Sequence, residues 1–253
     1  MKSRKKRPKP LSIAHRGFSD IYPQNTIIAF QKAIELKVDA IELDVSLSRD
    51  GHMIVFHDSE VSRLTDGEGF IKDLTLSEIK QLDAGVRYGD QYRGTKIPTL
   101  SEAVEVICKS DVRLCIELKA RHDDLKEGIE RKVLQILRNH DCLHNTMFTS
   151  YNGQVVKSLS EMCPGLLVGY DPSPEQTKNY PPDAILAICN EYKANAVLFD
   201  HRFVTSQLVR AVHCADLQIF VWTVNKPRNM LEMIDLSVDG IMTNCPDILT
   251  KFL

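Results

Sequence analysis

Apolar residues in this chain form short continuous runs that alternate with longer stretches in which every third or fourth residue is apolar. The first pattern predicts β-strands and the second predicts amphipathic α-helices. We expect eight strands, beginning near residues 11, 40, 113, 146, 166, 196, 218 and 240. An apolar stripe at Ile27, Phe30 and Ile34 indicates the first helix. Further helices are expected at about 100–108, 125–139, 153–162, 183–192, 206–214, 227–236 and 246–253.

Strands that alternate with helices indicate a parallel sheet. Eight such units in 253 residues match a (β/α)₈ TIM barrel, a fold of the α/β class. An open doubly wound sheet is the alternative, but no Gly-rich turn follows the first strand. Residues 59–100 are too long for a plain connector, so we expect a small insertion after the second strand, with a helical piece at 77–82.

The second expected strand, Ala40–Leu47, continues into a hairpin. Asp50-Gly51 is a strong turn signal, and Met53–Phe56 then returns as a short strand that ends at His57. If the turn contains only these two residues, His57 lies opposite Asp44. A longer loop would move the pairing by one position.

Polar residues gather at the carboxyl ends of the expected strands, where TIM barrels carry their chemistry. They are His15, Arg16, Glu42, Asp44, Glu117, Lys119, Trp222, Asn225 and Asn244. Each alone has a structural explanation, but together at one rim they indicate a site.

Three acidic residues of this rim suggest a metal site. Glu42 and Asp44 are two positions apart on one strand, so they project from one face roughly 7 Å apart. With Glu117 they form an oxygen-rich set without cysteine or paired histidine, which suits one hard divalent cation, Mg²⁺ or Ca²⁺.

His15 and His57 come from different elements but should face the same rim. Histidine gives and takes protons near neutral pH, so the pair suits general acid–base catalysis. Arg16 and Lys119 would add positive charge for phosphate oxygens. The whole set predicts hydrolysis of a phosphate diester.

The distribution of charge and the cysteine content limit which partners and which cellular location the protein can have. Six Lys and Arg residues lie within the first ten positions, so we expect a basic disordered tail at 1–10 that is either solvated or in weak contact with anionic lipid, followed by one domain at 11–253. The acidic remainder argues against nucleic acid as a partner. We expect no transmembrane segment and no secretory signal. Seven scattered cysteines suggest reduced core thiols and a cytoplasmic location. The oligomeric state stays open.

Seven motifs in order resemble the glycerophosphodiester phosphodiesterase family, and the resemblance covers residues 11–253. They are Ala14-His-Arg-Gly17, Pro23-Gln-Asn-Thr26, Glu42-Leu-Asp44, Phe56-His-Asp58, Ile116-Glu-Leu-Lys119, Val221-Trp-Thr-Val-Asn225 and Asp239-Gly-Ile-Met-Thr-Asn244.

The resemblance implies a TIM barrel with an insertion after its second strand. It also implies hydrolysis of small-molecule glycerophosphodiesters, such as glycerophosphocholine or glycerophosphoethanolamine, to glycerol 3-phosphate and an alcohol. By the same resemblance the three acidic residues would be metal ligands, Arg16 and Lys119 would contact phosphate, and Trp222 would wall the glycerol pocket. His15 would be the base and His57 the acid. One departure is Gln24, where the family usually has Glu.

Two alternatives remain open. A lysophospholipase D would need an apolar channel, and Phe70, Ile71, Leu74, Leu76 and Leu82 of the insertion could line one or form a small core of their own. A barrel that has lost catalysis and only binds phosphodiesters is the other alternative.

Overall fold

The computed structural model describes residues 9–119 and 128–253. Eight parallel strands form a closed barrel, because the first strand pairs with both the second and the last. The TIM-barrel prediction is confirmed, and an open sheet is excluded. The strands are β1 (Leu11–His15), β2 (Ala40–Leu47), β4 (Arg113–Leu118), β5 (Thr146–Ser150), β6 (Leu167–Tyr170), β7 (Ala196–Asp200), β8 (Gln218–Trp222) and β9 (Gly240–Thr243).

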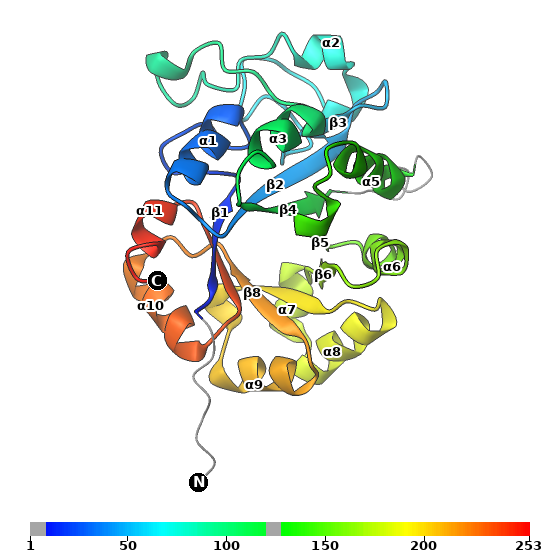
Figure 1. Ribbon diagram of the computed structural model, residues 1–253, viewed down its shortest axis with the longest axis vertical. Helices are drawn as coiled ribbons and strands as arrows, with labels where there is room; N and C mark the ends of the chain where they lie inside the picture. Colours follow the sequence, from blue (N-terminus) through cyan, green and yellow to red (C-terminus); the bar gives the residue numbers. More distant parts are fainter. Residues whose placement is uncertain (1–8, 120–127) are drawn as a thin grey trace.

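The helices surround the strands (Figure 1). Several begin at a hydroxyl or amide side chain that accepts a backbone N–H of the first turn, as at Thr26, Thr99 and Asn152. The helices are α1 (Ile27–Glu35), α3 (Leu100–Ile107), α5 (Ile129–Asn139), α6 (Gly153–Met162), α7 (Pro174–Asn179), α8 (Pro182–Glu191), α9 (Ser206–Cys214), α10 (Pro227–Leu236) and α11 (Pro246–Leu249).

Two apolar layers hold the barrel together. The larger layer lies between the strands and the helices, where alternate strand residues meet the apolar helix faces. The smaller one fills the barrel interior and includes Ile13, Ala40, Cys115 and Phe220. Toward the carboxyl ends of β2 and β4 the inward-facing residues change from apolar to acidic. The carboxylates therefore lie directly above the apolar interior of the barrel.

The insertion begins where β3 (Met53–Val55) pairs antiparallel with β2. It contains α2 (Leu76–Ile79) and extends beyond the ring of helices (Figure 1). Ile71 is fully buried in a separate core of the insertion, and Leu74, Leu76 and Leu82 pack against that core. Phe70 is exposed. These leucines therefore stabilise the insertion instead of lining a channel.

The hairpin differs from its prediction by one position. The loop between the two strands contains residues 48–52, and is therefore longer than the two-residue turn that the sequence suggested. A backbone hydrogen bond of 3.0 Å between residues 48 and 52 closes it. Phe56 N donates to Asp44 O at 3.0 Å, so Phe56 and not His57 lies opposite Asp44. The expectation for His57 was wrong by this single step.

Other differences concern helix ends. The last helix ends at Leu249, and α2 covers only four residues. Helix α7, which a capping box at Ser173 starts, was not predicted. Residues 125–127 of the expected helix at 125–139, and residues 1–8 of the basic tail, lie outside the described residues.

The prediction that all cysteines are free thiols is wrong for one pair. Cys108 and Cys142 form a disulfide. They are 34 positions apart, but each follows one of two helices, α3 and α5, that pack side by side. Cys115, Cys163, Cys189, Cys214 and Cys245 are free. A cytoplasmic location stays a prediction, and the disulfide removes the fully reduced cysteines as an argument for it.

None of the helices in the described ranges has the length and apolar character needed to cross a bilayer.

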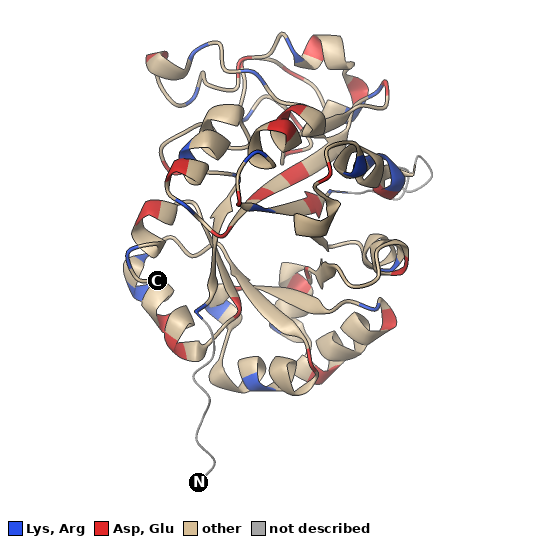
Figure 2. Cartoon of the chain, viewed as in Figure 1, with Lys and Arg blue, Asp and Glu red and all other residues tan. Residues whose placement is uncertain are grey.

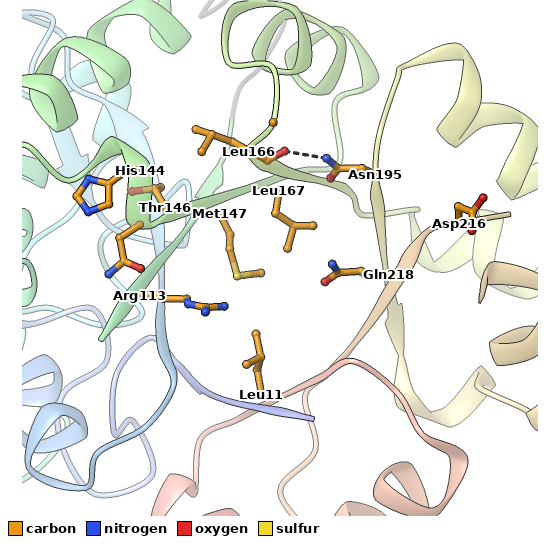
Figure 3. Close-up of a pocket in the computed structure, with 12 residues that line it drawn as sticks. Leu11, Arg113, His144, Thr146, Met147, Leu166, Leu167, Asn195, Asp216 and Gln218 are labelled. Carbon is orange, nitrogen blue, oxygen red and sulfur yellow. Dashed lines mark hydrogen bonds between the residues drawn. The ribbon is translucent and has the colours of Figure 1, made fainter. Parts of the chain in front are cut away.

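The amino ends of the strands surround a depression of about 440 Å³, whose lining includes Leu11, Arg113, Met147 and Gln218 (Figure 3). Because TIM-barrel chemistry takes place at the opposite end, we assign this depression no catalytic role.

Candidate active site

Three carboxylates converge at the carboxyl end of the barrel. The β2–β4 register places Asp44 beside Glu117, and Glu42 lies two positions before Asp44 on the same face. One oxygen from each of the three lies within 4.8 Å of the others. Figure 2 shows acidic positions on β2 inside the ring of helices. Glu42 and Asp44 are buried and Glu117 is partly buried, so this is a concentrated negative charge inside the protein.

The loop after β1 holds two of these carboxylates in place. Arg16 N donates to Glu42 Oε2 at 2.9 Å, and Asn25 Nδ2 donates to Asp44 Oδ2 at 2.8 Å. The chain turns sharply here, since Arg16 and Gly17 have φ angles of 59° and 79°. A Cβ at Gly17 would lie 2.7 Å from the carbonyl carbon of Ala29, so the turn requires glycine.

Two cations lie against the carboxylates. Lys119 Nζ is 2.6 Å from Glu117 Oε1 and 3.2 Å from Asp44 Oδ1. Arg16 Nε is 3.1 Å from Asp44 Oδ2, and Arg16 also donates to Gln24 Oε1 at 2.6 Å. Gln24 therefore still orients Arg16 without the negative charge of the family's usual Glu.

Burial and neighbouring charges shift the pKa values of the three carboxylates in different directions. Burial and then the negative Asp44 raise the pKa of Glu42 well above its usual value. Burial also raises the pKa of Glu117, against the effect of Lys119. At Asp44 burial acts in the same direction, but Lys119 and Arg16 outweigh it and hold the pKa well below its usual range. Glu42 therefore has the least compensated charge.

This cluster has the donor chemistry for a hard cation. Glu42 Oε1 is buried and has no hydrogen-bond partner among the described residues. Such an orphaned carboxylate oxygen is costly unless a cation lies beside it. Three carboxylates without sulfur donors suit Mg²⁺ or Ca²⁺ better than softer metals.

The two histidines lie in the same pocket but have different partners. His15 Nδ1 is 2.6 Å from Asn244 Oδ1, a neutral acceptor. His57 Nδ1 is 2.6 Å from Asp58 Oδ1, a carboxylate. Since both partners accept, each Nδ1 carries a proton and each Nε2 is left for chemistry. Burial lowers the pKa of His15 to about 3 and lowers that of His57 as well.

The pocket itself is small, with a volume of about 130 Å³. Every residue to which the sequence analysis gave a role lines it except Asp44, which is buried. Asn225 and Asn244, also named at the rim, do not line the pocket, and Asn225 Oδ1 accepts the backbone N–H of Asn244. Trp222, at the end of β8, forms part of the wall and donates its Nε1–H to Asp171 Oδ1 at 3.0 Å. Burial and then Glu117 raise the pKa of Asp171 to about 8.

Several residues of the site were not assigned a role from sequence. Asn25, Asp58 and Asn244 orient a carboxylate or a histidine, and Asp171 lines the pocket. The sequence contained a signal for three of them, because Asn25 and Asp58 fall inside the quoted motifs and Asn244 follows a strand. Asp171 follows a strand but falls outside the quoted motifs.

Comparison with known proteins places this geometry in a family context. The model of the glycerophosphoryl diester phosphodiesterase family matches residues 15–248. A glycerophosphodiester phosphodiesterase of Caldanaerobacter subterraneus subsp. tengcongensis is 38% identical over 97% of this chain and 98% of its own. One from Bacillus subtilis is 32% identical over 95% of this chain and 85% of its own.

Solved structures agree. A phosphodiesterase from Oleispira antarctica, solved in complex with the product sn-glycerol-3-phosphate, is 30% identical with a TM-score of 0.87, over 96% of both chains. A glycerophosphodiester phosphodiesterase from Thermotoga maritima is 27% identical with a TM-score of 0.77, over 98% of this chain and 100% of its own. The family match over nearly the whole chain, together with these relatives, shows that the chain belongs to the glycerophosphoryl diester phosphodiesterase family.

Proposed function

We propose that this protein is a phosphoric diester hydrolase that cleaves glycerophosphodiesters to glycerol 3-phosphate and an alcohol. The observation that carries the proposal is the convergence of Glu42, Asp44 and Glu117 within 4.8 Å in a pocket that also presents two histidines. The product bound to the Oleispira relative supports the same choice of substrate class.

Glu42, Asp44 and Glu117 would hold one divalent cation, Mg²⁺ or Ca²⁺. The cation would supply positive charge that offsets the carboxylates and the phosphate. The orphaned Glu42 Oε1 supports this role, because it has no hydrogen-bond partner among the described residues.

Arg16 and Lys119 would bind the phosphate oxygens. Both line the pocket and both are already held against carboxylates, so their positions are fixed before substrate arrives. Arg16 offers a planar set of donors and Lys119 a compact charge. Trp222 would wall the side of the pocket that takes the glycerol.

His15 would act as base and His57 as acid. His15 Nε2 would accept the proton of the attacking group, which is water or a neighbouring hydroxyl of the substrate. With the hydroxyl, the first product is a cyclic phosphate, which water must then open to give glycerol 3-phosphate. As the bond between phosphorus and the alcohol oxygen breaks, His57 would give that oxygen a proton. Their partners support this division. Burial lowers the pKa of His57, but the hydrogen bond to the Asp58 carboxylate acts in the opposite direction and favours the imidazolium that an acid must first be. Neutral Asn244 gives His15 no such charge.

Glycerophosphocholine and lysophosphatidylcholine, each with added Mg²⁺ or Ca²⁺, would test the substrate class by ³¹P NMR. We expect glycerophosphocholine to yield glycerol 3-phosphate, and lysophosphatidylcholine to react much more slowly. Release of phosphocholine instead would place the cut on the wrong side of the phosphate. Faster release of lysophosphatidic acid would favour the lysophospholipase D alternative.

A further inference from the structure

Asp171 lines the catalytic pocket but has no part in the reaction described above. It directly follows β6, which is four strands from β1 in either direction around the barrel. Asp171 therefore lies across the pocket from His15, on the side where Trp222 also stands.

One carboxylate oxygen of Asp171 is available for a ligand. Trp222 Nε1 donates to Oδ1 at 3.0 Å, and it is the only side-chain donor to Asp171 among the described residues. The raised pKa of Asp171 shows that its ionised form is poorly compensated, and a further hydrogen-bond donor at the free oxygen would stabilise that form. A substrate group that reaches this side would meet such an acceptor.

The proposed reaction determines which part of the substrate reaches Asp171. His57 would protonate the leaving alcohol, so this alcohol would lie toward the β2–β3 hairpin that carries His57. The retained glycerol would then extend away from the hairpin, toward β6 and β8. Its terminal hydroxyl is the group farthest from the phosphate and would reach deepest toward Asp171.

The expected orientation of the substrate and the lining of the pocket argue against a cationic ligand at this carboxylate. The choline or ethanolamine ammonium belongs to the leaving alcohol, which would lie toward the hairpin and away from Asp171. Trp222 is the only Phe, Tyr or Trp among the described residues that line the pocket, whereas quaternary ammonium sites use aromatic cages. The glycerol hydroxyl is then the group that reaches Asp171.

Resting on the proposed function, we propose that Asp171 is a specificity-determining residue that accepts a hydrogen bond from the free terminal hydroxyl of the substrate's glycerol. A lysophospholipid with an acyl chain at this hydroxyl cannot donate that bond. Asp171 would thus select deacylated diesters.

Three diesters and four variants test this assignment. The substrates are glycerophosphocholine, its analogue with hydrogen in place of the terminal hydroxyl, and the methyl diester of glycerol 3-phosphate, which has no cation. Asp171→Ala removes the carboxylate, and Asp171→Asn keeps an acceptor for Trp222 if the alanine variant folds poorly. Trp222→Phe removes the indole donor. Asp200→Asn is the matched control, because Asp200 ends the neighbouring strand β7 and pairs with Arg202 outside the pocket.

We expect Asp171→Ala to lower kcat/KM for glycerophosphocholine and for the methyl diester by about 3–100-fold, the range that runs from a hydrogen bond to a neutral acceptor to one to a charged acceptor. The analogue without the terminal hydroxyl should already be poor with the unsubstituted protein and should change less than about twofold in the variant. Asp171→Asn should show the same selectivity with a smaller loss, and Asp200→Asn should match the unsubstituted protein.

Equal losses on all three substrates, reproduced by Trp222→Phe, would mean that Asp171 only positions the indole and would overturn the assignment. A loss on glycerophosphocholine but not on the methyl diester would mean that Asp171 recognises the ammonium, which also overturns it. If the unsubstituted protein cleaves none of the three diesters, the proposed function itself fails, a result distinct from the two above.

Discussion

Replacing Glu42 by glutamine changes the least compensated carboxylate of the cluster while keeping its shape. Glutamine can still accept the hydrogen bond from Arg16 N through its amide oxygen. The change removes one charge from the proposed cation site. Its effect should therefore differ between metal-free and metal-loaded protein.

The metal-free effect follows from the raised pKa of Glu42. At pH 7 this carboxyl is ionised in the unfolded chain, whereas burial and Asp44 disfavour the ionised form in the folded chain. The folded state is therefore destabilised at every pH above the usual carboxyl pKa, and the penalty disappears below it. Glu42→Gln should give a metal-free free energy of unfolding at pH 7 equal to or above that of the unsubstituted protein.

The metal-loaded effect has the opposite sign. A ligand that binds only the folded state adds about 2.7 kcal/mol at a hundred times its Kd. For a domain of this size that corresponds to a Tm increase of about 5–11 °C. Glu42→Gln should lose most of this increase, because one of three ligand carboxylates is gone.

Differential scanning calorimetry in EDTA and across a titration of Mg²⁺ or Ca²⁺ measures both effects. Glu130→Gln is the control, since Glu130 is also a buried carboxylate but lies on α5, outside the pocket. It should keep the cation-dependent increase. A Glu42→Gln protein with the full increase, or one clearly less stable than the unsubstituted protein in EDTA, would refute this reasoning.

Four further substitutions have distinct outcomes. His57→Ala should lose about 10²–10⁴-fold on choline or ethanolamine diesters but recover on a p-nitrophenyl diester, whose leaving group needs no proton, while His15→Ala should be inactive on both; steady-state kinetics showing the reverse pattern would exchange the two roles. Trp222→Ala should raise KM with little change in Tm, whereas a stability loss of about 3–5 kcal/mol would assign the ring to the core. Gly17→Ala should lower Tm through a loss of about 1–3 kcal/mol, because the new Cβ would lie 2.7 Å from the Ala29 carbonyl carbon at a positive φ; an unchanged Tm would contradict the tight-turn interpretation.

The barrel could be predicted from sequence because its signals are local and repeated. Each strand is a short apolar run and each helix has its own stripe, so eight units could be recognised one at a time. The rim position of Glu42, Asp44 and Glu117 followed from the parallel order of the strands. Predicting the place of these carboxylates required no knowledge of side-chain contacts.

The differences arise where the outcome depends on contacts between distant residues. The hairpin register changed by one because the loop at 48–52 closes through its own hydrogen bond. Cys108 and Cys142 meet only because α3 and α5 pack together. Asp171 could not be selected from sequence, since its hydrogen-bond partner Trp222 is 51 positions away along the chain.

Turnover of glycerophosphocholine in excess EDTA, followed by addition of Mg²⁺ or Ca²⁺, tests the central claim most directly. ³¹P NMR would follow the appearance of glycerol 3-phosphate, with Glu42→Ala, Asp44→Ala and Glu117→Ala compared with the unsubstituted protein. We expect no product in EDTA, recovery when the cation is added, and no recovery in the three variants, all of which should remain folded. Full turnover in excess EDTA would contradict a cation held by these three carboxylates.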